Sequence, residues 1–234
     1  METQNTAYMH TSVILQNAVF PNFVAVWQTV NKQLVFRHIN LNFNEAIDGT
    51  LKEANLCGKE AYDLFFNIGP GSYTGIRQAF GFALGTAAGK SKIRYFPFTS
   101  FHIVHFLLGI QKADIPTFIQ GLPPIGRRKG RGERARVRGY ANVGTRFLYT
   151  SLEEFLKKYK NSAVYIDTND RELTGLLSPT TKVLTPQQAH RIKENIPNLV
   201  EFLTQRIAPI NASKLAQVKP LYINPVNITT PKSK

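Results

Sequence analysis

The order of strand-like and helix-like patterns along this chain constrains its fold more than any other feature. The first patterns are three short apolar runs rich in Val, Ile and Phe, at residues 12–20, 23–30 and 34–41. Turn signals (Pro-Asn and Asn-Lys) separate them, which predicts an antiparallel meander. Beyond residue 44, helical and strand patterns alternate. This alternation predicts an α/β fold.

The elements after the meander follow from periodicity and from cap residues. Asn44 and Ser100 are expected to cap helices. Ser151, followed three residues later by Glu154, forms a capping box and predicts another helix. The alternating Arg and apolar residues of 135–140 could form a hairpin strand. The remaining expected strands lie at 62–68, 92–99, 115–121, 162–168 and 182–185, and the helices at 45–56, 74–88, 101–109, 152–159 and 186–207.

The regular patterns weaken in the middle of the chain, which indicates a boundary between two lobes at 110–130. A chain of 234 residues can bury a substantial core without disulfides or metals. The expected division is a flexible leader at 1–11, an N-terminal lobe at 12–115, a smaller C-terminal lobe at 116–225 that includes a basic loop at 126–139, and a polar tail at 226–234.

A glycine-rich segment, IGPGSYTGIRQAFGFALG at 68–85, joins a predicted strand to a predicted helix. The dinucleotide fingerprint requires a third glycine where this chain has Thr74, and the P-loop spacing fails by one residue at Gly85 and Gly89. Backbone amides at such a helix start can still bind an anion. Capping by Ser72 or Thr74 would need no ligand, so both interpretations remain open.

The helix that follows carries Gly81, Gly85 and Gly89 at intervals of four residues, with Ala88 on the same face. A glycine inside a helix costs roughly 1 kcal/mol relative to alanine, so three of them require an explanation. Close approach of another backbone is the physical one. That backbone could belong to this chain or to another protein.

The segment 68–89 resembles the signature Gly-Pro-Gly-Ser-Phe/Tyr-Thr-Gly-Leu/Ile-Arg of TsaB, the bacterial partner protein in threonylcarbamoyladenosine modification of tRNA. The flanking segments 62–68, 92–108 and 219–225 are similar to those of the family as well. The resemblance implies an actin-like, sugar-kinase-like (ASKHA) fold of two related lobes, with mixed sheets and flanking helices. The signature turn comprises Gly69, Pro70, Gly71, Ser72, Tyr73, Thr74 and Gly75.

The resemblance also implies a non-catalytic subunit that binds the catalytic protein TsaD through the helix after the signature. ATP and metal are then expected on TsaD, with no cofactor bound by this chain alone. A TsaE-like ATPase is a further expected partner, and the chain could form a homodimer when TsaD is absent. The expected interface residues are Ile76, Arg77, Phe80, Gly81, Leu84, Gly85, Ala88 and Gly89.

The chain departs from the family pattern near its first strand. The family usually has an Asp-Thr-Ser turn there, and the aligned residues are Gln16, Asn17 and Ala18. A carboxylate that could help to hold a metal-bound nucleotide is therefore missing from this position, which argues against ATP turnover by this chain. Near the end of the chain, Asn224 replaces the family's arginine.

The chain is strongly basic, with 29 Lys and Arg against 15 Asp and Glu and a net charge of +14. Such a charge suggests an anionic partner, most plausibly nucleic acid. Arginine pairs with phosphate and stacks on bases, so the basic loop suits contact with tRNA, although a merely solubilising loop would look the same. The expected RNA-binding residues are Arg127, Arg128, Lys129, Arg131, Arg134, Arg136 and Arg138.

The other reactive side chains give weaker patterns. His102 and His105 lie one helical turn apart, as metal ligands can, but the segment supplies no third ligand, and satisfied histidines are favoured. Cys57 is the only cysteine, and a bystander role is favoured over a nucleophile. No signal sequence or membrane span is visible, so we expect a cytoplasmic protein. The alternatives are a stand-alone ATP-dependent transferase of actin-like fold, with Asp167 as its best acidic candidate, and a basic RNA-binding module.

Overall fold

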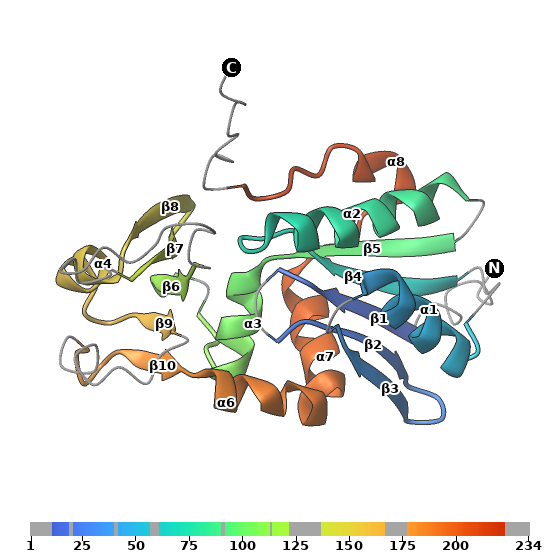
Figure 1. Ribbon diagram of the computed structural model, residues 1–234, viewed down its shortest axis with the longest axis horizontal. Helices are drawn as coiled ribbons and strands as arrows, with labels where there is room; N and C mark the ends of the chain where they lie inside the picture. Colours follow the sequence, from blue (N-terminus) through green and yellow to red (C-terminus); the bar gives the residue numbers. More distant parts are fainter. Residues whose placement is uncertain are drawn as a thin grey trace, which may run out of the picture.

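The computed structural model describes residues 11–18, 21–39, 42–56, 61–89, 92–112, 114–121, 137–166 and 177–222. The described residues form two five-stranded sheets, each flanked by helices, and helix α3 (Ser100–Leu107) lies between the sheets (Figure 1). No helix in the described ranges is long and apolar enough to cross a bilayer. The two mixed sheets agree with the predicted α/β class.

The first sheet has the strand order β3-β2-β1-β4-β5. Its three N-terminal strands pair antiparallel, which confirms the meander, and β4 and β5 continue the sheet in parallel with β1. Parallel neighbours place the carboxyl ends of β1, β4 and β5 at the same edge of the sheet. The strands are β1 Thr11–Gln16, β2 Phe23–Gln28, β3 Gln33–His38, β4 Ala61–Asn67 and β5 Lys92–Phe98.

Helices cover both faces of the first sheet because its strands are apolar on both sides. α1 (Phe43–Glu53) and α2 (Tyr73–Ala88) pack on one face, where Val13 and Leu15 are buried. α3 packs on the opposite face, where Ile14 is buried. The N-cap of α1 is Asn42, whose side chain accepts hydrogen bonds from the backbone N–H groups of Asn44 and Glu45. The prediction of Asn44 as the cap was therefore wrong by two residues.

The second sheet has the order β10-β9-β6-β7-β8, and α4 (Leu152–Lys158) covers one of its faces. The predicted capping box is confirmed, since Ser151 Oγ accepts from Glu154 N and the Glu154 side chain accepts from Ser151 N. A hairpin turn at Gly144, with φ of +60°, joins β7 to β8. The strands are β6 Thr117–Gln120, β7 Arg138–Val143, β8 Arg146–Ser151, β9 Ala163–Tyr165 and β10 Lys182–Leu184.

The C-terminal part of the chain differs from the predicted division into lobes. Its described residues from about 190 to 222 were expected in the lobe at 116–225, yet α7 packs on the first sheet, where Leu199 and Leu203 meet the core around Ile14. This helix buries an apolar face that the first sheet offers and that α3 alone does not cover. The helices involved are α6 Pro186–Ala189, the 3₁₀ helix η2 His190–Asn195, α7 Ile196–Arg206 and α8 Ala212–Leu215.

Candidate interaction site

The signature turn lies at the carboxyl edge of the first sheet, between β4 and α2. Three of its backbone N–H groups have acceptors within the protein. Gly69 N donates to Asn67 Oδ1 at 2.6 Å, Ser72 N donates to Ala18 O at 2.6 Å, and Gly75 N donates to Ser72 Oγ at 3.2 Å. Ser72 is the N-cap of α2. The predicted capping by Ser72 is thus confirmed, since its hydroxyl accepts from Gly75 N.

Three glycines of the signature turn are required by close packing. Gly69 and Gly71 have φ of +105° and +153°, which side chains rarely adopt. A methyl group on Gly71 would overlap the carbonyl oxygen of Ala18, and one on Gly75 would overlap that of Asn17. The absence of side chains at these glycines thus lets the residues that follow β1 pack directly against the turn.

A network of neutral polar groups lies beneath the turn. Asn67 Nδ2 donates to Gln16 Oε1 at 2.5 Å and to Ser100 Oγ at 3.1 Å, and Ser100 Oγ donates to Pro70 O at 2.7 Å. Gln16 is the last residue of β1, and the side chains of Gln16 and Asn17, which were predicted to align with the family's Asp-Thr-Ser turn, are amides. This network supports the turn from beneath.

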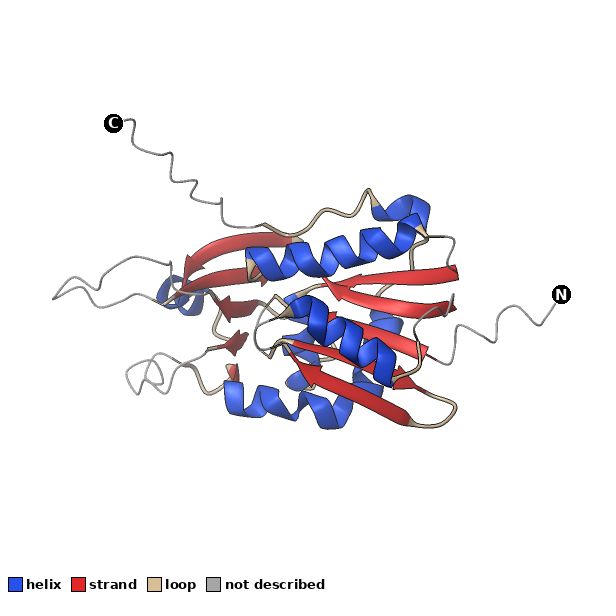
Figure 2. Cartoon of the chain, turned by 45° about the vertical axis from the view of Figure 1, so that its right-hand side comes forward, coloured by secondary structure: helices blue, strands red, loops and turns tan. Residues whose placement is uncertain are grey.

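α2 lies on the outside of the first sheet (Figure 2). The residues of its outer face are exposed from one end to the other. A Cβ atom added at Gly81 or Gly85 would meet nothing within 4 Å. Packing against another part of this chain therefore does not explain these two glycines within the described residues. Leu84, which lies beside Gly85, is 39% exposed, and Ala88 and Gly89 at the end of the helix are exposed as well.

Two of the expected interface residues do not lie on the outer face of α2. Ile76 is 1% exposed, so it belongs to the interior and does not contribute to the outer face of α2. Phe80 is half-buried, and its ring packs beside Phe66 with centroids 6.1 Å apart. Both residues anchor the helix to the first sheet.

An aromatic cluster at the start of α2 extends this exposed face. The rings of Tyr73 and Tyr222 lie 5.0 Å apart, and Arg77 Cζ lies 5.3 Å from the centroid of Tyr73. Burial, followed by the neighbouring Tyr73, raises the pKa of Tyr222. Leu221 N donates to Ile68 O at 2.7 Å, which fixes the C-terminal segment against the signature turn. The sequence offered Tyr222 only as part of the family-like segment at 219–225.

The two helical histidines have protein partners. His102 Nδ1 accepts from Thr99 N at 3.0 Å and so caps its own helix. His105 Nε2 lies 2.6 Å from Thr117 Oγ1, a contact that joins α3 to β6. Burial, as the largest cause, lowers the pKa of each histidine to about 4. No group of three metal-binding side chains occurs among the described residues. The hydrogen bonds of the two histidines to Thr99 and Thr117 give each a structural role.

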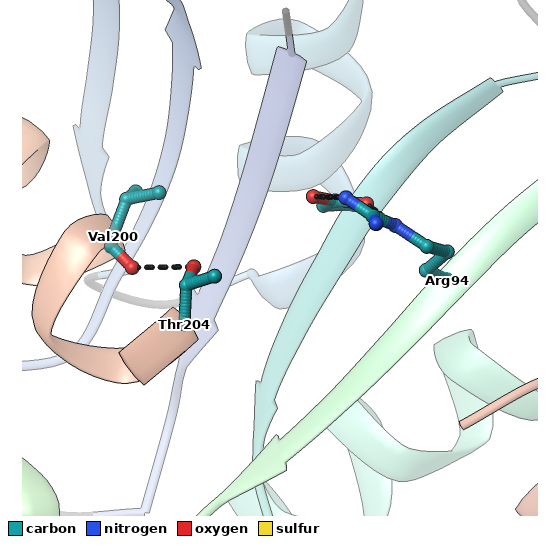
Figure 3. A network of polar contacts seen from close by, with 4 residues as sticks. Arg94, Val200 and Thr204 are labelled. Atoms are coloured by element: carbon teal, nitrogen blue, oxygen red, sulfur yellow. Dashed lines mark hydrogen bonds and ion pairs between the residues drawn. The ribbon is translucent and has the colours of Figure 1, made fainter. Parts of the chain in front are cut away.

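A buried carboxylate occurs away from the turn, in the middle of the first sheet. Asp63 on β4 accepts two hydrogen bonds from Arg94 on β5, each 2.7 Å long (Figure 3). Burial raises the pKa of Asp63, while the hydrogen bond and charge of Arg94 oppose that shift. This ion pair bridges neighbouring strands and is a structural feature.

The basic loop is described only where it enters the second sheet. Arg138 lies on β7 and is exposed. The other candidates for RNA binding fall outside the described residues, as do Cys57 and Asp167. They are Arg127, Arg128, Lys129, Arg131, Arg134 and Arg136.

The comparison with solved structures agrees with the predicted fold. Neither a protein-family model nor a curated protein matches the sequence. One similar solved structure is an uncharacterized protein from Pseudomonas aeruginosa with similarity to the peptidase YeaZ, at 13% identity and a TM-score of 0.59. Another is YeaZ from Pseudomonas aeruginosa, at 11% identity and a TM-score of 0.55. Each alignment covers 92% of this chain and 100% of the other. The predicted two-lobe α/β fold is thus confirmed, and the chain shares its fold with YeaZ.

Proposed function

We propose that this protein is a non-catalytic, TsaB-like subunit that binds and activates a TsaD-like catalytic protein in the cytoplasm. The complex would form N6-threonylcarbamoyladenosine at the tRNA adenosine next to the anticodon. The observation that carries the proposal is the outer face of α2, where Gly81 and Gly85 border open space. The signature-like turn fixes this helix to the sheet.

The physical argument is the close approach that two open glycines allow. Packed helices usually lie 8–10 Å apart, depending on the side chains between them. Gly81 and Gly85 remove those side chains over one turn of α2, so a partner helix can make backbone contact there. Leu84 and Tyr73, which are 39% and 42% exposed, would lose their contact with water on binding. Arg77 on the same face suits an acidic group of the partner.

The neutral network beneath the turn supports a non-catalytic role. Gln16 and Asn17 occupy the place where the family usually has a carboxylate, and Asn17 Nδ2 donates to Gln78 Oε1 at 2.9 Å. An amide cannot act as a general base or neutralise a metal ion as a carboxylate does. ATP and metal would accordingly be bound by the TsaD-like partner, with a TsaE-like ATPase as a third component. A second copy of this chain would compete for the same face of α2 when the partner is absent.

The test is size-exclusion chromatography with light scattering of this protein mixed with the TsaD of the same organism, with and without ATP. A stable heteromer is expected for the wild type, and Gly85→Leu is expected to abolish it while remaining a folded monomer. Asn198→Leu is a matched control, because it adds a leucine at an exposed position of α7, on the other face of the sheet. Unmixed wild-type proteins at micromolar concentration, or equal complex formation by both variants, would refute the proposal.

A further inference from the structure

The two sheets end in four edge strands, and β8 is the edge whose large apolar side chains remain exposed (Figure 1). β5 is paired at Tyr95 with Ile210, and their backbones exchange two hydrogen bonds of 2.9 Å. β10 has only three residues, and the apolar side chains of β3 are buried or half-buried. In the six-residue β8, Phe147 and Leu148 are 37% and 43% exposed. Such an edge is a template on which another strand can pair.

The ladder between β7 and β8 determines which backbone groups of β8 face away from the sheet. Leu152 N donates to Val137 O at 2.8 Å, one residue beyond the last registered pair of the two strands. Hydrogen-bonded pairs alternate along an antiparallel ladder, so the even-numbered residues of 146–152 bond toward β7. The N–H and C=O groups of Phe147 and Tyr149 therefore point to the open edge. The sheet order places no described strand beyond them.

A second copy of β8 matches this edge when a two-fold axis passes through Leu148. Residues directly opposite each other in an antiparallel pair share a face of the sheet. With the axis at Leu148, each Leu148 lies opposite its own copy, and Phe147 of one copy lies opposite Tyr149 of the other. The outward backbone groups of Phe147 and Tyr149 then form hydrogen-bonded pairs between the copies. The exposed Leu148 side chains contact each other and lose their contact with water.

The same register brings opposite charges together at both ends of the contact. Arg146 of one copy lies opposite Thr150 of the other, and Thr150 Oγ1 donates to Glu154 Oε2 at 3.0 Å, so a carboxylate lies beside this position. Arg146 is exposed and makes no ion pair with a described residue. A shift of the register by two residues would place Leu148 opposite Arg146 or Thr150 and lose the apolar pair. Charge and hydrophobicity therefore select one register.

We infer that a second copy of this chain binds along β8, so that the two C-terminal sheets continue as one antiparallel sheet across a two-fold axis. The contact is isologous, so pairing ends at the dimer. Because each copy contributes one short strand, the interface is small, and the dimer is expected only at concentrations well above micromolar. β8 belongs to the second sheet, whereas the proposed TsaD contact is on α2 of the first, so this inference does not rest on the proposed function.

The test is light scattering of the full-length protein at increasing concentration, with Gly85→Leu present throughout to prevent pairing through α2. The mass should rise from the monomer's 26.3 kDa toward twice that value between micromolar and several hundred micromolar concentration. Leu148→Lys or Leu148→Glu places like charges opposite each other at the axis and should weaken the dimer about tenfold or more. An equimolar mixture of these two variants should pair again. Val30→Lys is the matched control, since Val30 is 72% exposed in the turn between β2 and β3, outside the contact.

The charge contact is tested separately. Arg146→Gln and Glu154→Gln should each weaken the dimer severalfold, and the double variant should lose little more than either alone, because both changes remove one contact. Glutamine at position 154 can still complete the capping box, and thermal melting checks that each variant folds. A monomer at every concentration, equal effects of Leu148→Lys and Val30→Lys, or no recovery in the mixture would overturn the inference. Loss of TsaD binding by Leu148→Lys, with a parent protein that stays monomeric, would show that the edge binds TsaD and would likewise overturn it.

Discussion

Alanine at the two open glycines of α2 should stabilise the isolated protein. A Cβ atom at Gly81 or Gly85 meets nothing within 4 Å, so no steric penalty opposes the gain in helix propensity. Each replacement is expected to add about 0.5–1 kcal/mol to the free energy of unfolding, and both together about 1–2 kcal/mol. For a chain of 234 residues, this corresponds to a rise in Tm of about 2–8 °C.

The same substitution at Gly75 should have the opposite effect. A methyl group there would overlap the carbonyl oxygen of Asn17, and neither backbone can move without disturbing the signature turn. Overpacking of this kind costs about 1–3 kcal/mol or more. The comparison is informative because all three glycines lie in one helix and the chemical change is identical.

The stabilities are measured by urea denaturation and by calorimetry of the isolated protein, and complex formation with TsaD is measured in parallel. Gly81→Ala with Gly85→Ala should yield a more stable protein that binds TsaD less tightly. If Gly85→Ala lowered the Tm, or if Gly75→Ala raised it, the assignment of open and crowded glycines would be incorrect. If the double variant were more stable but bound TsaD with unchanged affinity, close approach at this face would be refuted.

Three further predictions concern the ion pair, a histidine and the aromatic cluster. Arg94→Leu should destabilise the protein by about 2 kcal/mol because the Asp63 side chain, 8% exposed, loses its partner; adding Asp63→Leu should recover much of the loss in urea denaturation, and additive losses would contradict this. Burial, followed by the charges of His102 and Arg206, lowers the folded-state pKa of His105 from 6.5 to about 4, so the unfolded state gains the proton first as pH falls. His105 should therefore account for about 2 kcal/mol of the stability lost between about pH 7 and pH 5, and His105→Gln should lose that much less over the same range in urea denaturation. Tyr222→Ala should weaken TsaD binding about tenfold in calorimetric titration without changing the Tm by more than a few degrees, and unchanged affinity would exclude Tyr222 from the interface.

Local signals in the sequence predicted the elements of this fold well. Ser151 and Glu154 act within one helical turn, so the sequence spacing alone specifies the capping box that the structure shows. The meander follows from runs of Val, Ile and Phe that can hardly form anything else between turn residues. Asn42 and Asn44 show the limit of local reasoning, because both are good N-caps and only the packing of Phe43 against the sheet selects the first.

Contacts between distant residues could not be predicted from these patterns. An amphipathic helix such as α7 carries an apolar face, but its sequence does not say which of two sheets will cover that face. Tyr73 and Tyr222 meet where Leu221 N hydrogen-bonds to Ile68 O, and no periodicity links these segments. The sequence therefore identified α2 as a helix with an exposed face, but it could not predict that Tyr222 lies beside that face.

The glycine-rich segment separates into two parts with different physical roles. Gly69 and Gly71 have positive φ, and a Cβ atom at Gly69, Gly71 or Gly75 would lie too close to neighbouring backbone atoms. Side chains at these positions would therefore disrupt the turn. Gly81 and Gly85 are crowded by nothing in the described chain, so folding alone would favour alanine at both. Two glycines on one exposed face are therefore better explained by a partner that needs close approach than by the packing of the described residues. The open space at Gly81 and Gly85 is the strongest physical reason to propose that a helix of another molecule packs against α2.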